Sequence, residues 1–117
     1  MTFSHGDYAD ISAIPEPQAV AEGLYLKALG YHPDHRAFLG LGMLYQKQHN
    51  FQDSMRIVKK GLGFYPDSFD LSLCQAINHM NTGDFTGALA LLLPHEEQTA
   101  ARAHIDLCYR ELGDFKS

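Results

Sequence analysis

Residues 35–68 read HRAFLGLGMLYQKQHNFQDSMRIVKKGLGFYPDS, and this stretch decides the fold class of the chain. Apolar residues recur over about 36–48 at the spacing of one helix face. That face comprises Ala37, Phe38, Leu41, Leu44 and Tyr45. His49 and Asn50 mark a turn, and a second helix is predicted over about 52–64. Pro66 then ends that helix. The stretch therefore predicts two helices joined by a short turn.

The positions of a few residue types in this stretch resemble the 34-residue tetratricopeptide repeat pattern, W-x2-L-G-x2-Y…A-x3-F…P. The matching positions, in the order of the pattern, are Phe38, Leu41, Gly42, Tyr45, Ser54, Val58 and Pro66. Phe38 replaces the Trp of the pattern, Ser54 replaces the Ala and Val58 replaces the Phe. The resemblance implies an all-α fold, a right-handed α-solenoid of antiparallel helix pairs with about six helices. It also implies a concave groove that binds a peptide or helix of another protein.

Weaker copies of the pattern flank this stretch on both sides. Residues 17–33 match only the second half of a repeat, so they predict a lone second helix or a cap. Residues 69–93 supply a further helix pair with its turn at Gly83 and Asp84. Residues 99–115 begin another pair. The resemblance therefore covers most of the chain.

The first helix of the 69–93 pair has two possible registers. A strict 34-residue step places Gln75 where the pattern expects its first-helix Leu. The apolar residues Leu71, Cys74 and Ile77 suit a register shifted by one residue instead. The residues alone leave both registers open.

The two ends of the chain carry their own expectations. Residues 1–15 lack a helical period and are predicted to form an extended leader, followed by a repeat domain over 16–117. The chain stops two residues after Phe115, where the pattern calls for another helix, so the last repeat is expected to be incomplete. The face that this helix would cover comprises Ile105, Tyr109 and Leu112. We expect the leader, a second copy or a partner to cover it.

Charge and composition argue against several classes of function. The net charge is −5 and Lys59-Lys60 is the only short basic pair, so binding to nucleic acid is not expected. No apolar run approaches about 18 residues, so no membrane span is expected. The start of the chain lacks the pattern of a secretory signal. Cys74 and Cys108 lie in apolar helical surroundings without CxxC spacing, which predicts buried, reduced thiols in a cytoplasmic protein.

No arrangement of residues in the sequence predicts catalysis. His32 and His35 form the only close histidine pair. Two ligands alone make a weak metal site, so solvated histidines at a helix junction are favoured. Gly40 and Gly42 lie inside a helical pattern and follow no strand, so they do not form a phosphate-binding loop. We therefore expect no enzyme, no metal and no cofactor.

The resemblance places a binding groove on the first helix of each pair. The groove positions that it implies are Arg36, Leu39, Met43, Gln46 and Lys47, then Asp70, Leu73, Ile77, Met80 and Asn81, then Ala100, Ala103, Leu107, Arg110 and Glu111. The residues expected to carry binding are Arg36, Leu39, Met43, Lys47, Leu73, Ile77 and Leu107. A register shift by one residue would replace Leu73 and Ile77 with Ser72 and Ala76, which leaves the groove less apolar.

The apolar residues of the groove indicate the kind of ligand. Some members of the family hold the C-terminal carboxylate of a peptide with Lys, Arg and Asn at such positions. This chain has Leu39, Met43, Leu73 and Ile77 instead. The difference favours an apolar or amphipathic helix, and Met43 adds adaptability.

These observations favour a protein-interaction module without catalysis. A first alternative is an auxiliary or regulatory region of a larger multidomain protein. A second is a self-associating scaffold, a homo-oligomer in which the unfinished end pairs with another copy. The groove residues have a further alternative of their own, which is to pack against the leader or against a neighbouring domain.

Phe38 and Tyr45 lie on the predicted packing face, so their truncation tests that face. Removing a large buried aromatic side chain costs about 3–5 kcal/mol, a large share of the stability of a small domain. We therefore expect Phe38→Ala and Tyr45→Ala to leave the protein partly unfolded. A loss of less than about 1 kcal/mol in a urea melt would show that the packing face is wrong.

Overall fold

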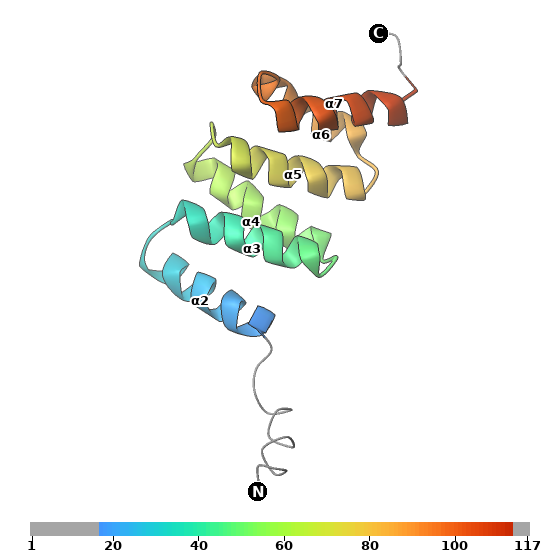
Figure 1. Ribbon diagram of the computed structural model, residues 1–117. Coiled ribbons are helices and arrows are strands. Elements are labelled where there is room, and N and C mark those ends of the chain that lie inside the picture. Colours follow the sequence, from blue (N-terminus) through green and yellow to red (C-terminus); the bar gives the residue numbers. More distant parts are fainter. Residues whose placement is uncertain (1–16, 114–117) are drawn as a thin grey trace, which may run out of the picture.

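The computed structural model describes residues 17–113, and that range contains six α-helices, one short 3-10 helix and no strand. Figure 1 shows the helices side by side in chain order. Their bounds are α2 Pro17–Tyr31, α3 His35–Lys47, α4 Phe51–Phe64, α5 Phe69–Asn81, α6 Phe85–Leu92, η2 Leu93–His95 and α7 Thr99–Glu111. The prediction of an all-α fold with about six helices is confirmed. The predicted leader over 1–15 and the residues after Gly113 lie outside the described residues.

Capping residues and turns set the boundaries of these helices. Each of α3, α4, α5 and α6 begins after a residue whose side chain accepts a backbone N–H of the first turn. These residues are Asp34, Asn50, Ser68 and Asp84. The turn before α6 contains Gly83 at φ 86°, and Gly113 follows α7 at φ 80°. Glycine suits both positions because other residues rarely adopt positive φ.

Helix α5 lies at the centre of the packing. It contacts α3 and α4 on one side and α6 on the other, while α2 packs on α3 and α7 packs on α6 (Figure 1). One buried cluster, between α3, α4 and α5, comprises Phe38, Val58, Leu71 and Cys74. A second cluster, between α5, α6 and α7, comprises Ala76, Ala88, Leu89, Leu92, Ala101, Ile105 and Cys108. Because α5 contributes to both clusters, its register aligns one half of the structure with the other.

The burial pattern of α5 decides its register. Four residues of α3 and the four residues of α5 that lie 34 positions later are all buried. The pairs are Ala37 with Leu71, Phe38 with Ser72, Leu41 with Gln75, and Gly42 with Ala76. The structure therefore follows the strict 34-residue step rather than the shifted one. Leu73 and Ile77 are consequently half-buried, whereas Ser72 and Ala76 point into the protein.

Two glycines allow α3 and α4 to approach closely. A Cβ added at Gly42 would overlap Val58, and one added at Gly61 would lie 2.8 Å from the Cβ of Phe38. Both glycines are buried. The cost of glycine to helix propensity, about 1 kcal/mol each, is therefore offset by contacts that a larger residue would prevent.

A buried chain of hydrogen bonds joins α3, α4 and α5. The Ser54 hydroxyl donates to the carbonyl oxygen of Gly42 at 2.7 Å, and Asn78 Nδ2 donates to Ser54 Oγ at 2.7 Å. Gln46 Nε2 then donates to Asn78 Oδ1 at 2.9 Å. Ser54 and Asn78 have no exposed surface. Since a buried amide or hydroxyl without a partner is costly, this chain of bonds constrains how the three helices align.

Helix α2 packs on α3 along one stripe of half-buried residues. All four stripe residues, Ala21, Tyr25, Ala28 and Leu29, are half-buried. The Tyr25 ring lies over Gly40, where an added Cβ would overlap it. No residue of α2 is fully buried, so this helix is held less firmly than the others.

Phe38 and Tyr45 differ in burial, although both were expected to pack inward. Phe38 is 3% exposed within the first cluster, which agrees with its predicted role. Tyr45 is half-buried, and its hydroxyl donates to Glu22 Oε2 at 2.6 Å. Tyr45 therefore links α3 to α2, and we expect Tyr45→Ala to cost less than Phe38→Ala.

Ile105 was expected on the face of α7 that the leader, a second copy or a partner would cover, and this placement is wrong. This residue is 7% exposed and belongs to the second cluster, where α6 covers it. Tyr109 is half-buried and Leu112 is 47% exposed.

None of the helices between residues 17 and 113 is both long enough and apolar enough to cross a bilayer.

Two glycine substitutions test the close approach of α3 and α4. Gly42→Ala should lower the free energy of unfolding by about 1–3 kcal/mol, because the new methyl group overlaps Val58. The matched Gly23→Ala change in α2 should raise it by about 0.5–1 kcal/mol, because nothing lies within 4 Å of the added Cβ. Urea melts measure both. Effects of the same sign would contradict the packing described for Gly42.

Candidate protein-binding groove

The seven predicted groove residues differ in exposure. Arg36 and Lys47 are exposed near the two ends of α3, and Met43 between them is 55% exposed. Leu39 is half-buried against the first cluster, and Leu73 is half-buried against the second. These two leucines therefore pack in part against the described helices themselves.

Ile77 and Leu107 lie together in one hollow between α5 and α7. The hollow measures about 460 Å³ and is lined by Ile77, Met80, Asn81, Phe85, His104, Leu107 and Glu111. The α5 residues are spaced at i, i+3 and i+4, and the α7 residues at i, i+3 and i+7. Residues at these spacings share a helix face. Each helix thus turns one face toward the same space, and Phe85 lines it from the start of α6.

The polar groups of this hollow are mostly engaged within their own helices. Asn81 Nδ2 donates to the carbonyl oxygen of Ile77 at 2.8 Å. His104 Nδ1 lies 2.8 Å from the carbonyl oxygen of Ala100. Among residues 17–113, Glu111 takes part in no ion pair. The hollow therefore offers apolar side chains and one carboxylate at its edge.

One groove position points elsewhere than expected. Gln46 faces α5, where its Nε2 donates to Asn78 Oδ1 and, at 3.0 Å, to the carbonyl oxygen of Cys74. It thus belongs to the buried chain of hydrogen bonds, and it is not available to a ligand. The sequence around Gln46 does not indicate this hydrogen bond, because the partner amide of Asn78 lies 32 residues later in the chain.

Two residues of the hollow were not predicted, Phe85 and His104. Phe85 belongs to a second helix, and the resemblance assigns the groove to first helices. His104 lies three residues before Leu107, so a search for neighbours of Leu107 on the same helix face would have found it. Phe85 shows that α6 also contributes to the lining of the hollow.

Among the described residues, no group of three or more His, Cys, Asp or Glu side chains could hold a metal ion. Both cysteines are buried and unpaired, as expected. Burial raises the pKa of the Cys74 thiol to about 11, and it also raises that of Cys108. These thiols therefore stay protonated and unreactive at neutral pH.

No family model matches the chain, and no curated protein matches it.

The Tyr45–Glu22 contact makes stability depend on pH. Burial, followed by the hydrogen bond to Glu22 and its charge, raises the pKa of Tyr45 from 10.0 to about 12. Above pH 10 the unfolded chain loses the phenolic proton, whereas the folded chain keeps it until about pH 12. This contribution to the free energy of unfolding is therefore complete below pH 10 and is lost between pH 10 and 12.

Tyr45→Phe should remove that part of the pH dependence. We expect the variant to lose less stability than the wild type between pH 10 and 12, as measured by urea melts at several pH values. Tyr31→Phe, on the exposed side of α2, is the control for the loss of one phenol. Identical curves for Tyr45→Phe and the wild type would contradict the proposed role of the contact.

Proposed function

We propose that this chain is a protein-interaction module that holds an apolar or amphipathic helix of another protein in the groove on α3, α5 and α7. In this proposal the pairs α3–α4 and α5–α6 are antiparallel repeats of a right-handed tetratricopeptide-type solenoid. The module acts without catalysis and without a cofactor, in the cytoplasm.

The observation that carries the proposal is the apolar hollow between α5 and α7. Ile77, Met80 and Leu107 leave apolar surface open there, while Asn81 and His104 bond to their own backbone. Completely burying a Leu, Ile or Met side chain contributes about 1.5–3 kcal/mol. An incoming apolar side chain thus gains contacts and displaces no hydrogen bond of the protein.

Two features support a repeat architecture. The buried residues of α3 and α5 recur at a spacing of 34 positions, and Gly42 and Gly61 lie where α3 and α4 approach closely. Helices that repeat in this way present equivalent faces side by side. Met43 and Ile77, which are also 34 positions apart, are thereby expected to lie along one groove.

Two charged residues of α3 support a role in binding a partner protein. Arg36 and Lys47 are exposed at the rim of the groove, and surface charges of this kind mainly change the rate of association. Acidic groups on a partner would be steered toward them, with an effect that fades in salt.

A second candidate function, a self-associating scaffold, is favoured by the outer face of α2. Val20 is 46% exposed, Leu24 63% and Tyr31 79%, and these residues share one side of the helix. A neighbouring domain of a larger protein would cover the same face. The two candidates use different helices, so they can be tested separately.

Leu107→Glu and Met43→Glu should abolish capture of the partner while the chain stays folded. Leu107 is 37% exposed in the hollow, and Leu93 in η2 is 39% exposed outside it, so Leu93→Glu is a matched control. We expect pull-downs with the wild type and Leu93→Glu to retain one protein that both groove variants lose. With that protein purified, affinity should fall by at least about tenfold for each groove variant.

Two further measurements interpret this experiment. Circular dichroism establishes that each variant is folded. If Leu107→Glu unfolds the chain while Met43→Glu still captures the partner, the groove proposal is wrong. A solution mass above that of one chain, reduced by Leu24→Glu, would support the self-associating scaffold instead.

A further inference from the structure

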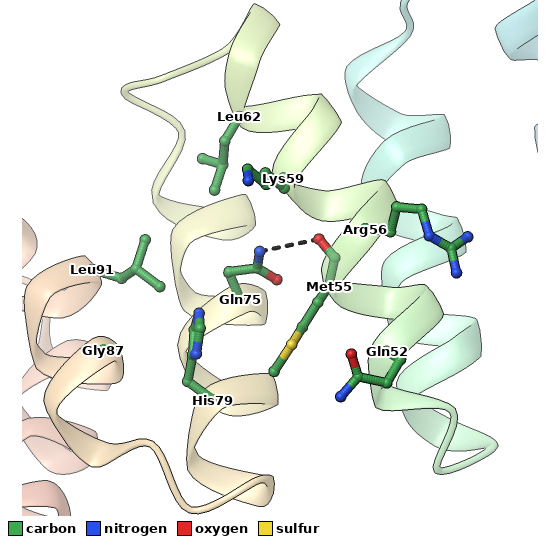
Figure 2. A pocket seen from close by; sticks show the side chains of 9 residues that line it. All are labelled: Gln52, Met55, Arg56, Lys59, Leu62, Gln75, His79, Gly87 and Leu91. Carbon is green, nitrogen blue, oxygen red and sulfur yellow. Dashed lines mark hydrogen bonds between the residues drawn. The ribbon is translucent and has the colours of Figure 1, made fainter.

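A second hollow lies on the opposite side of α5 from the groove. It measures about 570 Å³ and lies between α4 and α6, with Gln75 and His79 of α5 at its base (Figure 2). At about 100° per residue, these two residues lie roughly half a turn around α5 from Ile77 and Met80. The two hollows therefore belong to separate surfaces.

The polar groups at the base of this hollow already have partners. Gln75 Nε2 donates to the carbonyl oxygen of Met55 at 3.1 Å, and His79 Nδ1 lies 3.1 Å from Asp84 Oδ2. Figure 2 shows Leu62 of α4 and Leu91 of α6 on opposite walls. The apolar atoms of these leucines and of Met55, which are all half-buried, are left to contact an occupant. Gly87 also lines the hollow, and because it has no side chain, α6 leaves space for an occupant at that position.

The rim formed by α4 is positively charged in an acidic protein. Helix α4 carries Arg56, Lys59 and Lys60 against the single carboxylate of Asp53, a formal charge of +2, whereas the chain carries −5. Asp53 pairs with Arg56. Within residues 17–113, Lys59 and Lys60 take part in no ion pair. Arg56 and Lys59 both line the hollow, so its unpaired positive charge lies beside its apolar walls.

We propose that this surface, the hollow between α4 and α6 together with the cations of α4, docks an acidic amphipathic helix of a second protein. Met55 and Leu62 are seven residues apart, so they repeat along α4 at about 10 Å. An occupant helix with apolar residues at i and i+7 matches that spacing. Its acidic residues, on the side toward α4, meet Lys59, which lines the hollow.

The features of the surface favour a protein over other anionic partners. Three cations in one helix are few for a phosphate backbone, which is bound by many clustered Lys and Arg residues. A lipid surface is flat, whereas these apolar side chains line a hollow between two helices. The site is independent of the groove proposed above, since neither Met43 nor Leu107 lines it.

The probe is a synthetic peptide of about 14 residues that repeats Glu-Ala-Leu-Leu-Glu-Glu-Leu, with both ends blocked, titrated into the ¹⁵N-labelled full chain. We expect amide shifts to concentrate on α4 and α6 around Met55, Leu62 and Leu91. Raising the salt from about 50 to about 300 mM should weaken binding, because surface charges are screened. A peptide with Lys in place of each Glu and a peptide with Ser in place of each Leu should leave the amides of α4 and α6 unshifted.

Lys59→Glu should weaken binding of the acidic peptide by at least about tenfold, whereas Lys27→Glu, the same charge change on exposed α2, should leave it unchanged. Met43→Glu should also leave it unchanged. Shifts confined to α5 and α7, or equal binding of the Lys peptide, would overturn the proposal. Binding to phosphatidylserine vesicles that Lys59→Glu abolishes, without binding of the peptide, would assign the surface to a membrane and overturn it as well.

Discussion

The buried contact between Gly42, Ser54 and Asn78 is the constraint on which the rest of the structure depends. Gly42 lets α4 approach until the Ser54 hydroxyl reaches the carbonyl oxygen of Gly42 at 2.7 Å, and Asn78 of α5 completes the link at 2.7 Å. Hydrophobic contact alone tolerates small shifts between helices, since it has little directional preference. A buried amide does not, because an unpaired polar group in the interior costs about 1–3 kcal/mol. The three helices therefore have one favourable alignment.

The alignment of α5 determines which of its residues can function. With Leu71, Gln75 and Asn78 turned inward, Ile77 and Met80 face α7 while His79 lies at the base of the hollow beside α4. One helix thus contributes to two clusters and to two separate surfaces. A substitution in its buried positions is expected to disturb both surfaces, whereas changes at Leu107 or Lys59 act on one surface each. If both surfaces bind as proposed, this separation leaves room for two partners at once.

The two surfaces differ in the physics of recognition. In the hollow between α5 and α7 the polar side chains of Asn81 and His104 are engaged with their own helices, so the recognition that we propose there rests on shape and apolar contact. The hollow beside α4 adds Lys59 and Arg56 to apolar walls, so the recognition that we propose there also depends on charge. The outer face of α2 carries little charge. The helix itself is held to α3 mainly through Tyr25 and the Tyr45–Glu22 hydrogen bond.

The sequence by itself determined the number of helices, most of their bounds and the burial of Phe38, because apolar spacing and capping residues act locally. It also indicated Met43, Ile77 and Leu107 as surface residues, through their positions in the repeat. It left the register of α5 open, since Leu71, Cys74 and Ile77 suggest a shift of one residue. Only the tertiary structure decided that register. Gln75 and Asn78 are polar yet buried because Met55, Ser54 and Gln46 on other helices bond to them, and no local pattern reveals partners that lie 20 to 32 residues away.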